Sequence, residues 1–230
     1  MNNRPKQIGL LGGTFDPVHN GHLGLAEKAI QAFDLDKVLF IPASQSPHKI
    51  QSPPTASMHR IAMLRLALKG KADFPLELLE INRSGISYTI DTISQLKIQH
   101  PDWDLYLILG ADAFLMIDTW KNYAEIFKCC HLLVSTRPGI NLEVPDKLCQ
   151  TLALKKDQRE INNPSQWITL NPAIGKSIRL FQIPPQDISS KIIRGKVQAG
   201  KEIKNLLPPE VDHYIMKNRL YRTESPPIEI

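Results

Sequence analysis

Two adjacent glycines near the N-terminus constrain the fold of this chain more than any other feature. Gly12 and Gly13 follow an apolar run, residues 8–11, and precede an amphipathic run, residues 23–33. This order predicts a strand, a tight turn and a helix. A helix start offers unpaired N–H groups and the positive end of a dipole, and both favour a bound anion. His19 and His22 are three residues apart, so a helical turn would place both imidazoles beside that anion.

Strand-like and helix-like runs alternate along most of the chain. This pattern predicts an α/β fold, a Rossmann-like parallel sheet flanked by helices. Ligands of such sheets bind beyond the carboxyl ends of the strands, where Gly12, Pro42 and Gly110 fall. The predicted strands span residues 7–11, 37–42, 76–82, 104–109, 131–135 and 178–183, and the predicted helices span residues 23–33, 57–68, 89–99 and 123–128.

The last third of the chain is less regular. Residues 139–176 contain three prolines and a polar run, and we expect helix and loop there. From Ile188 onward the pattern is helical again, with breaks at Gly200 and at the Pro208-Pro209 pair. We therefore expect a core over residues 1–187 and a small helical C-terminal extension over residues 188–230, which together act as one functional domain.

Composition narrows the classes of protein that this chain can belong to. Hydrophobic residues make up 42% of the chain, and no apolar run approaches the roughly 20 residues of a membrane-spanning helix. The N-terminus is polar and lacks the apolar stretch of a secretory signal, so we expect none. Three cysteines, two of them adjacent, make no disulfide framework and fit a reducing cytoplasm. A net charge of +5 suits either nucleic acid or polyphosphate ligands. Because no nucleic-acid-binding motif appears, we expect no nucleic-acid partner. Because no apolar run is long enough, we expect no membrane partner either.

Six short motifs lie next to the ends of predicted elements. They are GGTFDPVHNGH (residues 12–22), SPHK (46–49), SYTIDT (87–92), GAD (110–112), RPG (137–139) and ISSKIIR (188–194). Together they resemble the bacterial nicotinate-nucleotide adenylyltransferase family of the HxGH nucleotidylyltransferase superfamily, and the match runs from Ile8 to about Tyr221. The resemblance implies an enzyme that joins ATP to nicotinic acid mononucleotide, giving deamido-NAD and pyrophosphate in NAD biosynthesis.

The resemblance implies a set of ATP-binding residues, three of which are catalytic. His19 and His22 would donate hydrogen bonds to the α-phosphate oxygens, and Arg194 would stabilise the leaving pyrophosphate. Lys191 stands where the family has a threonine, so one hydroxyl is replaced by a cation. The implied ATP-binding residues are Gly12, Gly13, Thr14, Phe15, His19, His22, Lys49, Gly110, Asp112, Ser189, Ser190 and Arg194.

A second set of residues is implied for the mononucleotide. The helix that starts near Thr89 would face the nicotinate carboxylate, and Trp120 would stack on the pyridine ring. Structural alternatives remain for several of these residues, because Thr89 and Asp112 also suit helix N-caps and Trp120 also suits a core. Ser46 replaces the first proline of the family's PPHK segment. The implied residues are Phe15, Asp16, His48, Lys49, Tyr88, Thr89, Trp120 and Arg137.

The implied reaction depends on positioning and charge stabilisation, because it passes through no covalent intermediate. Mg²⁺ would bridge the phosphates while keeping several waters, so we expect no metal site built by the protein itself. Two other functions stay open at this point. One is a different HxGH adenylyltransferase, with nicotinamide mononucleotide or pantetheine phosphate as acceptor, and the other is a non-catalytic nucleic-acid-binding protein. A monomer and a homodimer are both compatible with the sequence.

Overall fold

The computed structural model describes residues 4–47, 53–136, 144, 146–153, 159–163, 167–170, 175–184 and 187–222. The strands are β1 (Lys6–Gly13), β2 (Lys37–Pro42), β3 (Trp103–Gly110), β4 (His131–Thr136), β5 (Arg159–Asn163), β6 (Trp167–Leu170) and β7 (Ile178–Gln182). The helices are α1 (Asn20–Phe33), α2 (Ser57–Ala67), α3 (Leu79–Arg83), α4 (Thr89–Gln99), α5 (Ala111–Leu115), the 3₁₀ turn η2 (Ile117–Thr119), α6 (Tyr123–Cys129), α7 (Asp146–Thr151), α8 (Ser190–Gln198) and α9 (Pro209–Lys217).

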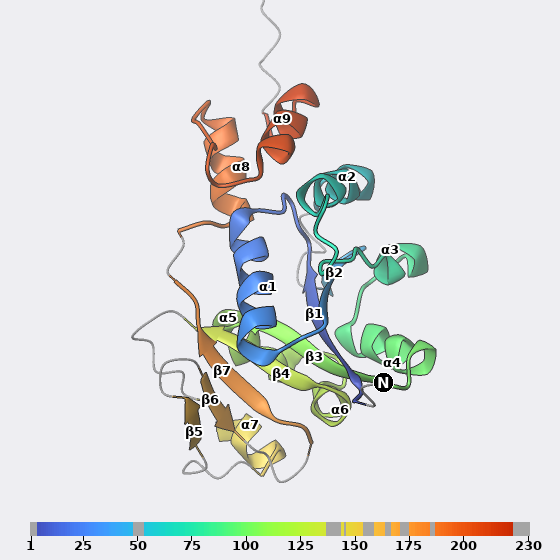
Figure 1. Ribbon diagram of the computed structural model, residues 1–230. Helices are drawn as coiled ribbons and strands as arrows, with labels where there is room; N and C mark the ends of the chain where they lie inside the picture. The colour runs from blue at the N-terminus through green and yellow to red at the C-terminus, as the bar shows by residue number, and fades with distance from the viewer. Residues whose placement is uncertain are drawn as a thin grey trace, which may run out of the picture.

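The strands form one sheet in the order β2-β1-β3-β4-β7-β6-β5 (Figure 1). The first five strands of this order are parallel, whereas β6 pairs antiparallel with β7, and β5 pairs antiparallel with β6 at the edge. The predicted α/β class, with a parallel sheet flanked by helices, is therefore confirmed. None of the helices in the described ranges has the length and apolar character needed to cross a membrane.

Two apolar cores lie on the two faces of the sheet. Alternation along β1 divides its residues between them, with Leu11 in one core and Ile8 and Leu10 in the other. The first core contains residues of α1, α2, α8 and α9, and the second contains residues of α4, α5, α6 and α7. Because both faces are covered, the carboxyl edge of the parallel strands is left as the place for a ligand.

The predicted strand over residues 76–82 is wrong. Only Leu76 pairs with the sheet, through an isolated bridge to Phe40, and the chain then turns into α3. The Glu77 side chain accepts a hydrogen bond from the Leu79 backbone N–H at 3.1 Å, which helps to start this short helix. A short apolar run fits both periods, so the sequence alone does not separate them.

The expectation of helix and loop over residues 139–176 also needs correction. The helix α7 lies there, but so do β5 and β6, which pair as an antiparallel hairpin and extend the sheet beyond β7. These strands are short and β5 is polar, so they lack the continuous apolar run that marks the parallel strands. Backbone pairing supplies their hydrogen bonds, of β6 with β7 and of β5 with β6, and the sequence does not show these partners.

The C-terminal helices pack on the same core as α1 and α2. Ile193 and Val197 of α8 and Val211 and Ile215 of α9 are buried in it. The described part of the extension predicted over residues 188–230, which ends at residue 222, contains these two helices. Its boundary at residue 187 stays a prediction, because the shared core joins both parts.

A polar cluster surrounds Asp104 near the start of β3, away from the carboxyl edge of the sheet. Lys176 donates to its Oδ1, and Tyr106 Oη donates to its Oδ2 at 3.2 Å. His131 Nε2 lies 3.4 Å from the same Oδ2, and His131 Nδ1 lies 2.7 Å from Ser177 Oγ. Burial lowers the pKa of His131 to about 4. The folded protein therefore holds this imidazole neutral at pH 7.

This shift predicts that the protein loses stability as the pH falls below 6.5. The unfolded chain binds a proton at His131 near pH 6.5, but the folded chain does not until about pH 4. Protons therefore favour the unfolded state in that window. Through His131, the free energy of unfolding should fall by about 2–3 kcal/mol between pH 7 and pH 4.5. Urea unfolding of wild type and His131→Asn at the two pH values measures it, and the variant should depend less on pH. Exposed His213→Gln should behave as wild type; an unchanged pH dependence in His131→Asn would refute the assignment.

Candidate active site

The two histidines of the first motif lie at the start of α1. His19 is the N-cap residue and His22 is in the first turn, and their rings stack with centroids 3.6 Å apart. The backbone N–H of His19 donates to His22 Nδ1 at 3.2 Å. When His22 is neutral, this bond places its own proton on Nε2. The fold thus presets one imidazole as an Nε2–H donor at a helix N-terminus.

His19 is the more buried member of the pair, with 7% of its surface exposed. Its Nδ1 has no hydrogen-bond partner among the described residues, and burial lowers its pKa to about 4. It is therefore neutral at pH 7 in the absence of a nearby anion. A bound phosphate would favour the protonated form and reverse part of this shift.

The loop between β1 and α1 is held by two buried side chains. Phe15 has a φ of +50° and packs its 1%-exposed ring against His22, with centroids 4.9 Å apart. Asp16 accepts hydrogen bonds from Tyr221 Oη at 2.7 Å and from the Thr55 backbone N–H at 3.1 Å. Both residues were predicted to contact nucleotide. Their side-chain contacts favour a role in shaping the loop, because the Phe15 ring is buried and each Asp16 carboxylate oxygen already accepts a bond.

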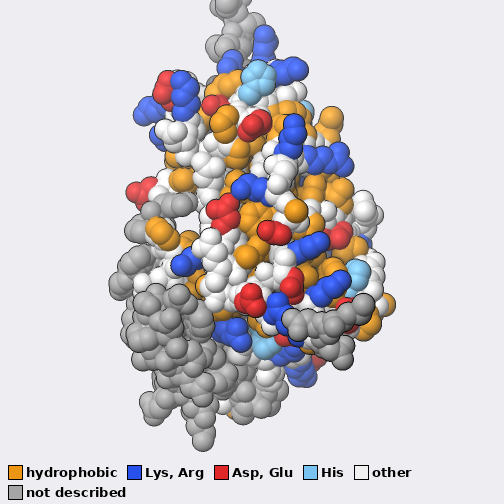
Figure 2. All heavy atoms as spheres, viewed as in Figure 1, with side chains coloured by type: hydrophobic (Ala, Val, Ile, Leu, Met, Phe, Trp, Pro, Cys, Tyr) orange, Lys and Arg blue, Asp and Glu red, His pale blue; other side chains and the backbone are white. Residues whose placement is uncertain are grey.

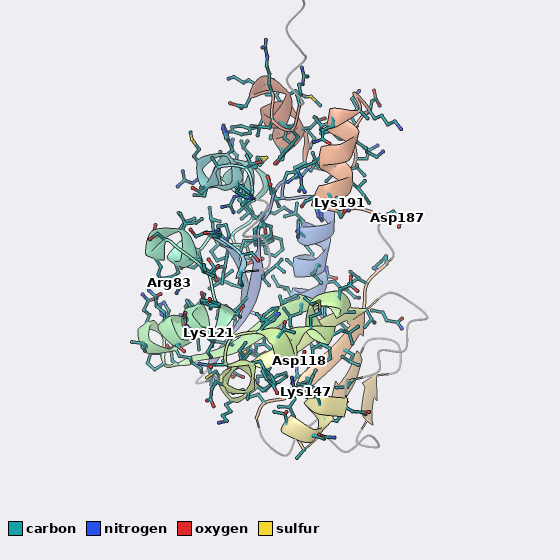
Figure 3. The ribbon with its side chains drawn as sticks, turned by 180° about the vertical axis from the view of Figure 1, so that it is seen from behind. Arg83, Asp118, Lys121, Lys147, Asp187 and Lys191 are labelled. Carbon is teal, nitrogen blue, oxygen red and sulfur yellow. The ribbon has the colours of Figure 1, made fainter. Side chains whose placement is uncertain are left out.

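The predicted phosphate-binding residues of α8 lie against this same loop. Ser189 caps the helix by accepting from the Ile192 N–H at 3.2 Å. Ser190 Oγ donates to the Pro17 carbonyl at 2.8 Å, and Arg194 Nη1 donates to the Asp16 carbonyl at 2.7 Å. More than 170 residues separate these partners along the chain. The structure therefore brings the first and last motifs together, with Lys191 exposed at the start of α8 (Figure 3).

Sequence reasoning missed a residue that joins the site loops. Arg60 of α2 is 1% exposed and donates four hydrogen bonds to backbone carbonyls. Nη1 reaches the carbonyls of Thr14 and Ala43 at 2.9 and 2.8 Å, Nη2 reaches that of Ser44 at 3.3 Å, and Nε reaches that of Thr55 at 2.9 Å. One guanidinium therefore links the loop after β1 to the loop after β2.

We predict that Arg60→Met destabilises the fold by about 3–5 kcal/mol, because four carbonyls lose a charged donor within a buried region. Arg65→Met on the same helix is the matched control, since Arg65 is exposed, and it should cost less than about 0.5 kcal/mol. Chemical denaturation of both variants gives the two values. If the two variants lost the same amount of stability, the hydrogen bonds of Arg60 would not contribute measurably to the stability of the fold.

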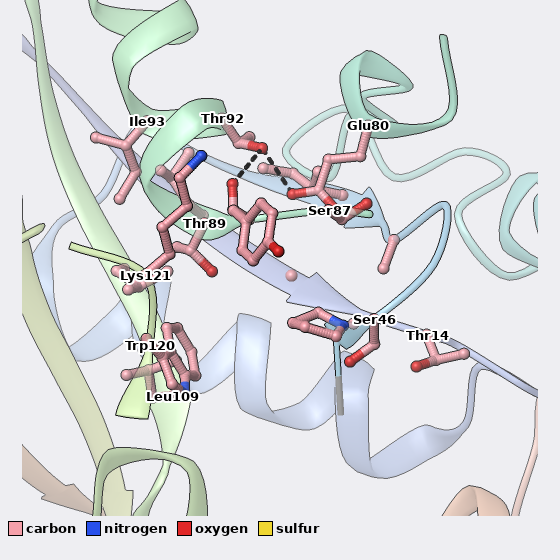
Figure 4. Close-up of a pocket in the computed structure, with 18 of the residues that line it drawn as sticks. Thr14, Ser46, Glu80, Ser87, Thr89, Thr92, Ile93, Leu109, Trp120 and Lys121 are labelled. Atoms are coloured by element: carbon pink, nitrogen blue, oxygen red, sulfur yellow. Dashed lines mark hydrogen bonds between the residues drawn. The ribbon is translucent and has the colours of Figure 1, made fainter. Parts of the chain in front are cut away.

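A pocket of about 430 Å³ opens at the carboxyl ends of β1 and β2 (Figure 4). Its volume lies in the range of small-molecule sites. Six of the residues predicted to bind ATP or the mononucleotide line it, namely Gly12, Gly13, Thr14, Tyr88, Thr89 and Trp120. Sequence reasoning did not anticipate Glu80, Thr92 or Lys121 in its wall.

The N-terminus of α4 forms one side of this pocket. Tyr88 is its N-cap residue and Thr89 its first residue, so the alternative in which Thr89 caps the helix is wrong. The first N–H groups of a helix have no partner within it, and here they lie at the pocket. Lys121 Nζ lies 3.0 Å from Asp91 Oδ2 and 4.6 Å from the centroid of the Tyr88 ring. The helix dipole therefore places positive potential at this end, while the charge of Lys121 is paired with Asp91.

Trp120 and the glycines near the ends of β1 and β3 were also predicted to contact substrate. Trp120 lines the pocket and also packs against the second core, so both of its predicted roles are compatible with its place. Gly110 is the N-cap of α5, which leaves Asp112 exposed in the first turn and not capping the helix. A Cβ added at Gly12 or Gly110 would meet no atom within 4 Å, so both strand ends are open. The predicted residues His48, Lys49 and Arg137 lie outside the described residues.

Comparison with known proteins identifies the family of this chain. A family model described as cytidylyltransferase-like matches residues 10–196. A protein of Citrifermentans bemidjiense named probable nicotinate-nucleotide adenylyltransferase is 40% identical over 215 residues, which cover 94% of this chain and 98% of that protein. A protein of Desulfitobacterium hafniense with the same name is 40% identical over 222 residues, 96% and 99% of the two chains. The chain belongs to the nicotinate-nucleotide adenylyltransferase family. It is a nucleotidyltransferase.

Solved structures show the same fold. A Plasmodium falciparum nicotinic acid mononucleotide adenylyltransferase complexed with NaAD superposes with a TM-score of 0.70 at 19% identity, over 94% of this chain and 97% of that one. The same enzyme complexed with APC gives a TM-score of 0.68 at 20% identity, over the same shares. The resemblance recognised in the sequence is therefore confirmed at the level of family and fold.

Proposed function

We propose that this protein transfers the adenylyl group of ATP to nicotinic acid mononucleotide, forming nicotinic acid adenine dinucleotide and pyrophosphate for NAD biosynthesis. The observation that carries the proposal is the stacked pair His19–His22 at the N-terminus of α1, next to a pocket at the carboxyl edge of the sheet. The pair suits a triphosphate, and the pocket suits a flat anionic ring. Relatives at 40% identity bear the corresponding name.

In this proposal a phosphate oxygen of the mononucleotide attacks the α-phosphorus of ATP. A new P–O bond forms, the bond from the α-phosphorus to the bridging oxygen breaks, and pyrophosphate leaves with that bond's electron pair. His22 Nε2–H donates to the α-phosphate oxygens as their charge increases. Arg194 has donors beyond the one it gives to the Asp16 carbonyl, and these serve the leaving pyrophosphate.

The pocket of Figure 4 takes the nicotinate end of the mononucleotide in this proposal. Trp120 offers its ring to the pyridine, and the start of α4 offers N–H groups to the carboxylate. Gly12 and Gly13 line the pocket and also precede the loop between β1 and α1, which leads to His19. The reacting phosphates therefore meet at the turn after β1, between the N-termini of α1 and α4.

We also propose Mg²⁺ as the ion that accompanies ATP, where it neutralises charge on the phosphates. The described residues contain no group of three or more His, Cys, Asp or Glu side chains arranged to hold a metal. Asp112, exposed in the first turn of α5 just after β3, would approach a phosphate-bound ion through water. This donor set fits an ion held mainly by substrate.

A coupled assay of pyrophosphate release tests the function directly. Purified protein with ATP and Mg²⁺ is offered nicotinic acid mononucleotide, nicotinamide mononucleotide and phosphopantetheine in separate reactions. Release with phosphopantetheine alone would overturn the proposed acceptor.

The nucleic-acid alternative has no support on the face drawn in Figure 2. This face mixes Lys and Arg with acidic and apolar side chains and shows no continuous basic stripe. Retention of labelled ATP on a filter, with and without RNA competitor, tests that alternative.

We predict that His22→Ala lowers kcat by about 10²–10³, the range for the loss of one preorganised donor to a developing oxyanion. KM should change far less, because the bond to the α-phosphate is strongest in the transition state. Steady-state kinetics of wild type and variant measure both constants. Exposed His213→Gln is the control and should match wild type. A rise confined to KM would show that His22 only binds substrate.

The start of α4 predicts a preference for the acid over the amide mononucleotide. A carboxylate accepts bonds from helix N–H groups, whereas an amide NH₂ would place a donor against donors, at a cost of about 1–3 kcal/mol. The ratio of kcat/KM should therefore favour the acid by about 5- to 150-fold. Measuring kcat/KM for both mononucleotides decides the point. Equal values would remove the anion site from the proposal.

A further inference from the structure

A carboxylate in the pocket wall conflicts at first sight with an anionic ligand. Glu80 lines the pocket and is 8% exposed. Burial raises the pKa of its carboxyl group. A buried acid near the expected position of the nicotinate carboxylate would repel it if charge were the whole of its effect. Its hydrogen bonds indicate a different role.

Glu80 is the acceptor at the end of an ordered chain of donors. Arg83 Nη2 donates to Thr92 Oγ1 at 3.0 Å, so that hydroxyl directs its own proton elsewhere. Thr92 Oγ1 donates to Glu80 Oε1 at 2.7 Å (Figure 4). Ser87 also hydrogen-bonds Glu80, and Ser87 Oγ accepts from the Ser44 N–H at 3.0 Å. The carboxylate therefore ties α3, α4 and the loop after β2 together.

Thr92 has one other acceptor within reach, and it belongs to the start of α4. The Tyr88 carbonyl lies 3.5 Å from Thr92 Oγ1. That carbonyl already accepts from the backbone N–H groups of Asp91 and Thr92, at 3.1 and 3.3 Å. If Glu80 did not hold the hydroxyl, Thr92 would bond back to Tyr88, a bond that tends to bend the turn in which it forms.

We propose that Glu80 is a positioning residue for the acceptor substrate: by holding Thr92 and Ser87, it fixes the first turn of α4 at the place where the nicotinate carboxylate binds. Ser87 directly precedes the N-cap Tyr88, and Thr92 lies one turn further on, so the two bonds hold α4 on both sides of its exposed N–H groups. Arg83, the last residue of α3, is the donor at the start of this network. It lies on the same side of the molecule as Lys121 (Figure 3). The inference rests on the proposed function of the pocket.

Two substitutions distinguish positioning from charge, because both weaken the link to α4 but only one of them removes the charge. Glu80→Gln removes the negative charge and turns one acceptor into a donor. Thr92→Val keeps the charge and the β-branched shape but cuts the link to α4. If Glu80 positions the helix, both variants bind the mononucleotide more weakly. If Glu80 acts only through its charge, Glu80→Gln binds the anion more tightly.

The experiment is steady-state kinetics with each substrate varied in turn. For both variants we expect KM for nicotinic acid mononucleotide to rise by about 5- to 20-fold, the equivalent of one lost hydrogen bond. KM for ATP and kcat should stay within about twofold, as for lost uniform binding of one substrate. Glu27→Gln, whose carboxylate pairs with Lys71 on the surface, is the matched control and should leave all three constants unchanged.

The double variant Glu80→Gln/Thr92→Val gives a further test. Because both changes cut one network, its KM should resemble that of the single variants and not their product. Unchanged or lowered KM for the mononucleotide in Glu80→Gln would overturn the inference, as would an equal rise in KM for ATP. Thermal unfolding checks that each variant folds, and Ser87→Ala replaces Glu80→Gln if that variant does not. Failure of the proposed function is separate, because wild type itself would then release no pyrophosphate with this acceptor.

Discussion

The guanidinium of Arg60 donates to carbonyls of the loop after β1, the loop after β2 and the segment before α2, all from a fully buried position. These loops are irregular backbone at the edge of a parallel sheet, and their carbonyls have no strand to pair with. A single planar donor group satisfies them and fixes their separation. Burial lowers the pKa of Arg60, and the carboxylate of Asp16 opposes part of this effect. The same carboxylate accepts a hydrogen bond from Tyr221 near the end of the described chain. The geometry of the proposed site thus depends on one buried charge and its neighbours.

This arrangement explains how residues at both ends of the sequence serve one reaction in the proposed function. Once the β1–α1 loop is fixed, its carbonyls at Asp16 and Pro17 become acceptors for Arg194 and Ser190 of α8. Arginine suits this position because one nitrogen can hold the loop while the others remain for a phosphate. Lysine would have a single charged nitrogen for both tasks. The side chain that approaches the phosphates is therefore positioned by the same loop that carries the histidines.

The sequence predicts well the elements that are marked by long apolar periods. The limits of β2 and α4 agree with expectation, and β1, β3, β4 and β7 differ by only a few residues. It fails where a short apolar run fits two periods, as at residues 76–82, and where a polar strand depends on a neighbour, as in β5. Motifs at strand ends predict which residues gather, because parallel strands end at one edge. Arg60 and Glu80 escape prediction, since their partners are backbone carbonyls or hydroxyls that only the fold brings near.

Two helix N-termini meet the β1 turn, and both substrates of the proposed reaction are anions. The start of α1 carries a neutral His19 whose pKa is held near 4 by burial, so it adds no fixed charge before a phosphate arrives. The start of α4 has a lysine at its rim, but Asp91 pairs with that lysine. In both places the positive potential comes mainly from oriented N–H groups and not from free cations. Such groups bind an anion only at a defined distance and angle, which is why side chains that fix the backbone, such as Glu80 and Arg60, are expected to matter for binding.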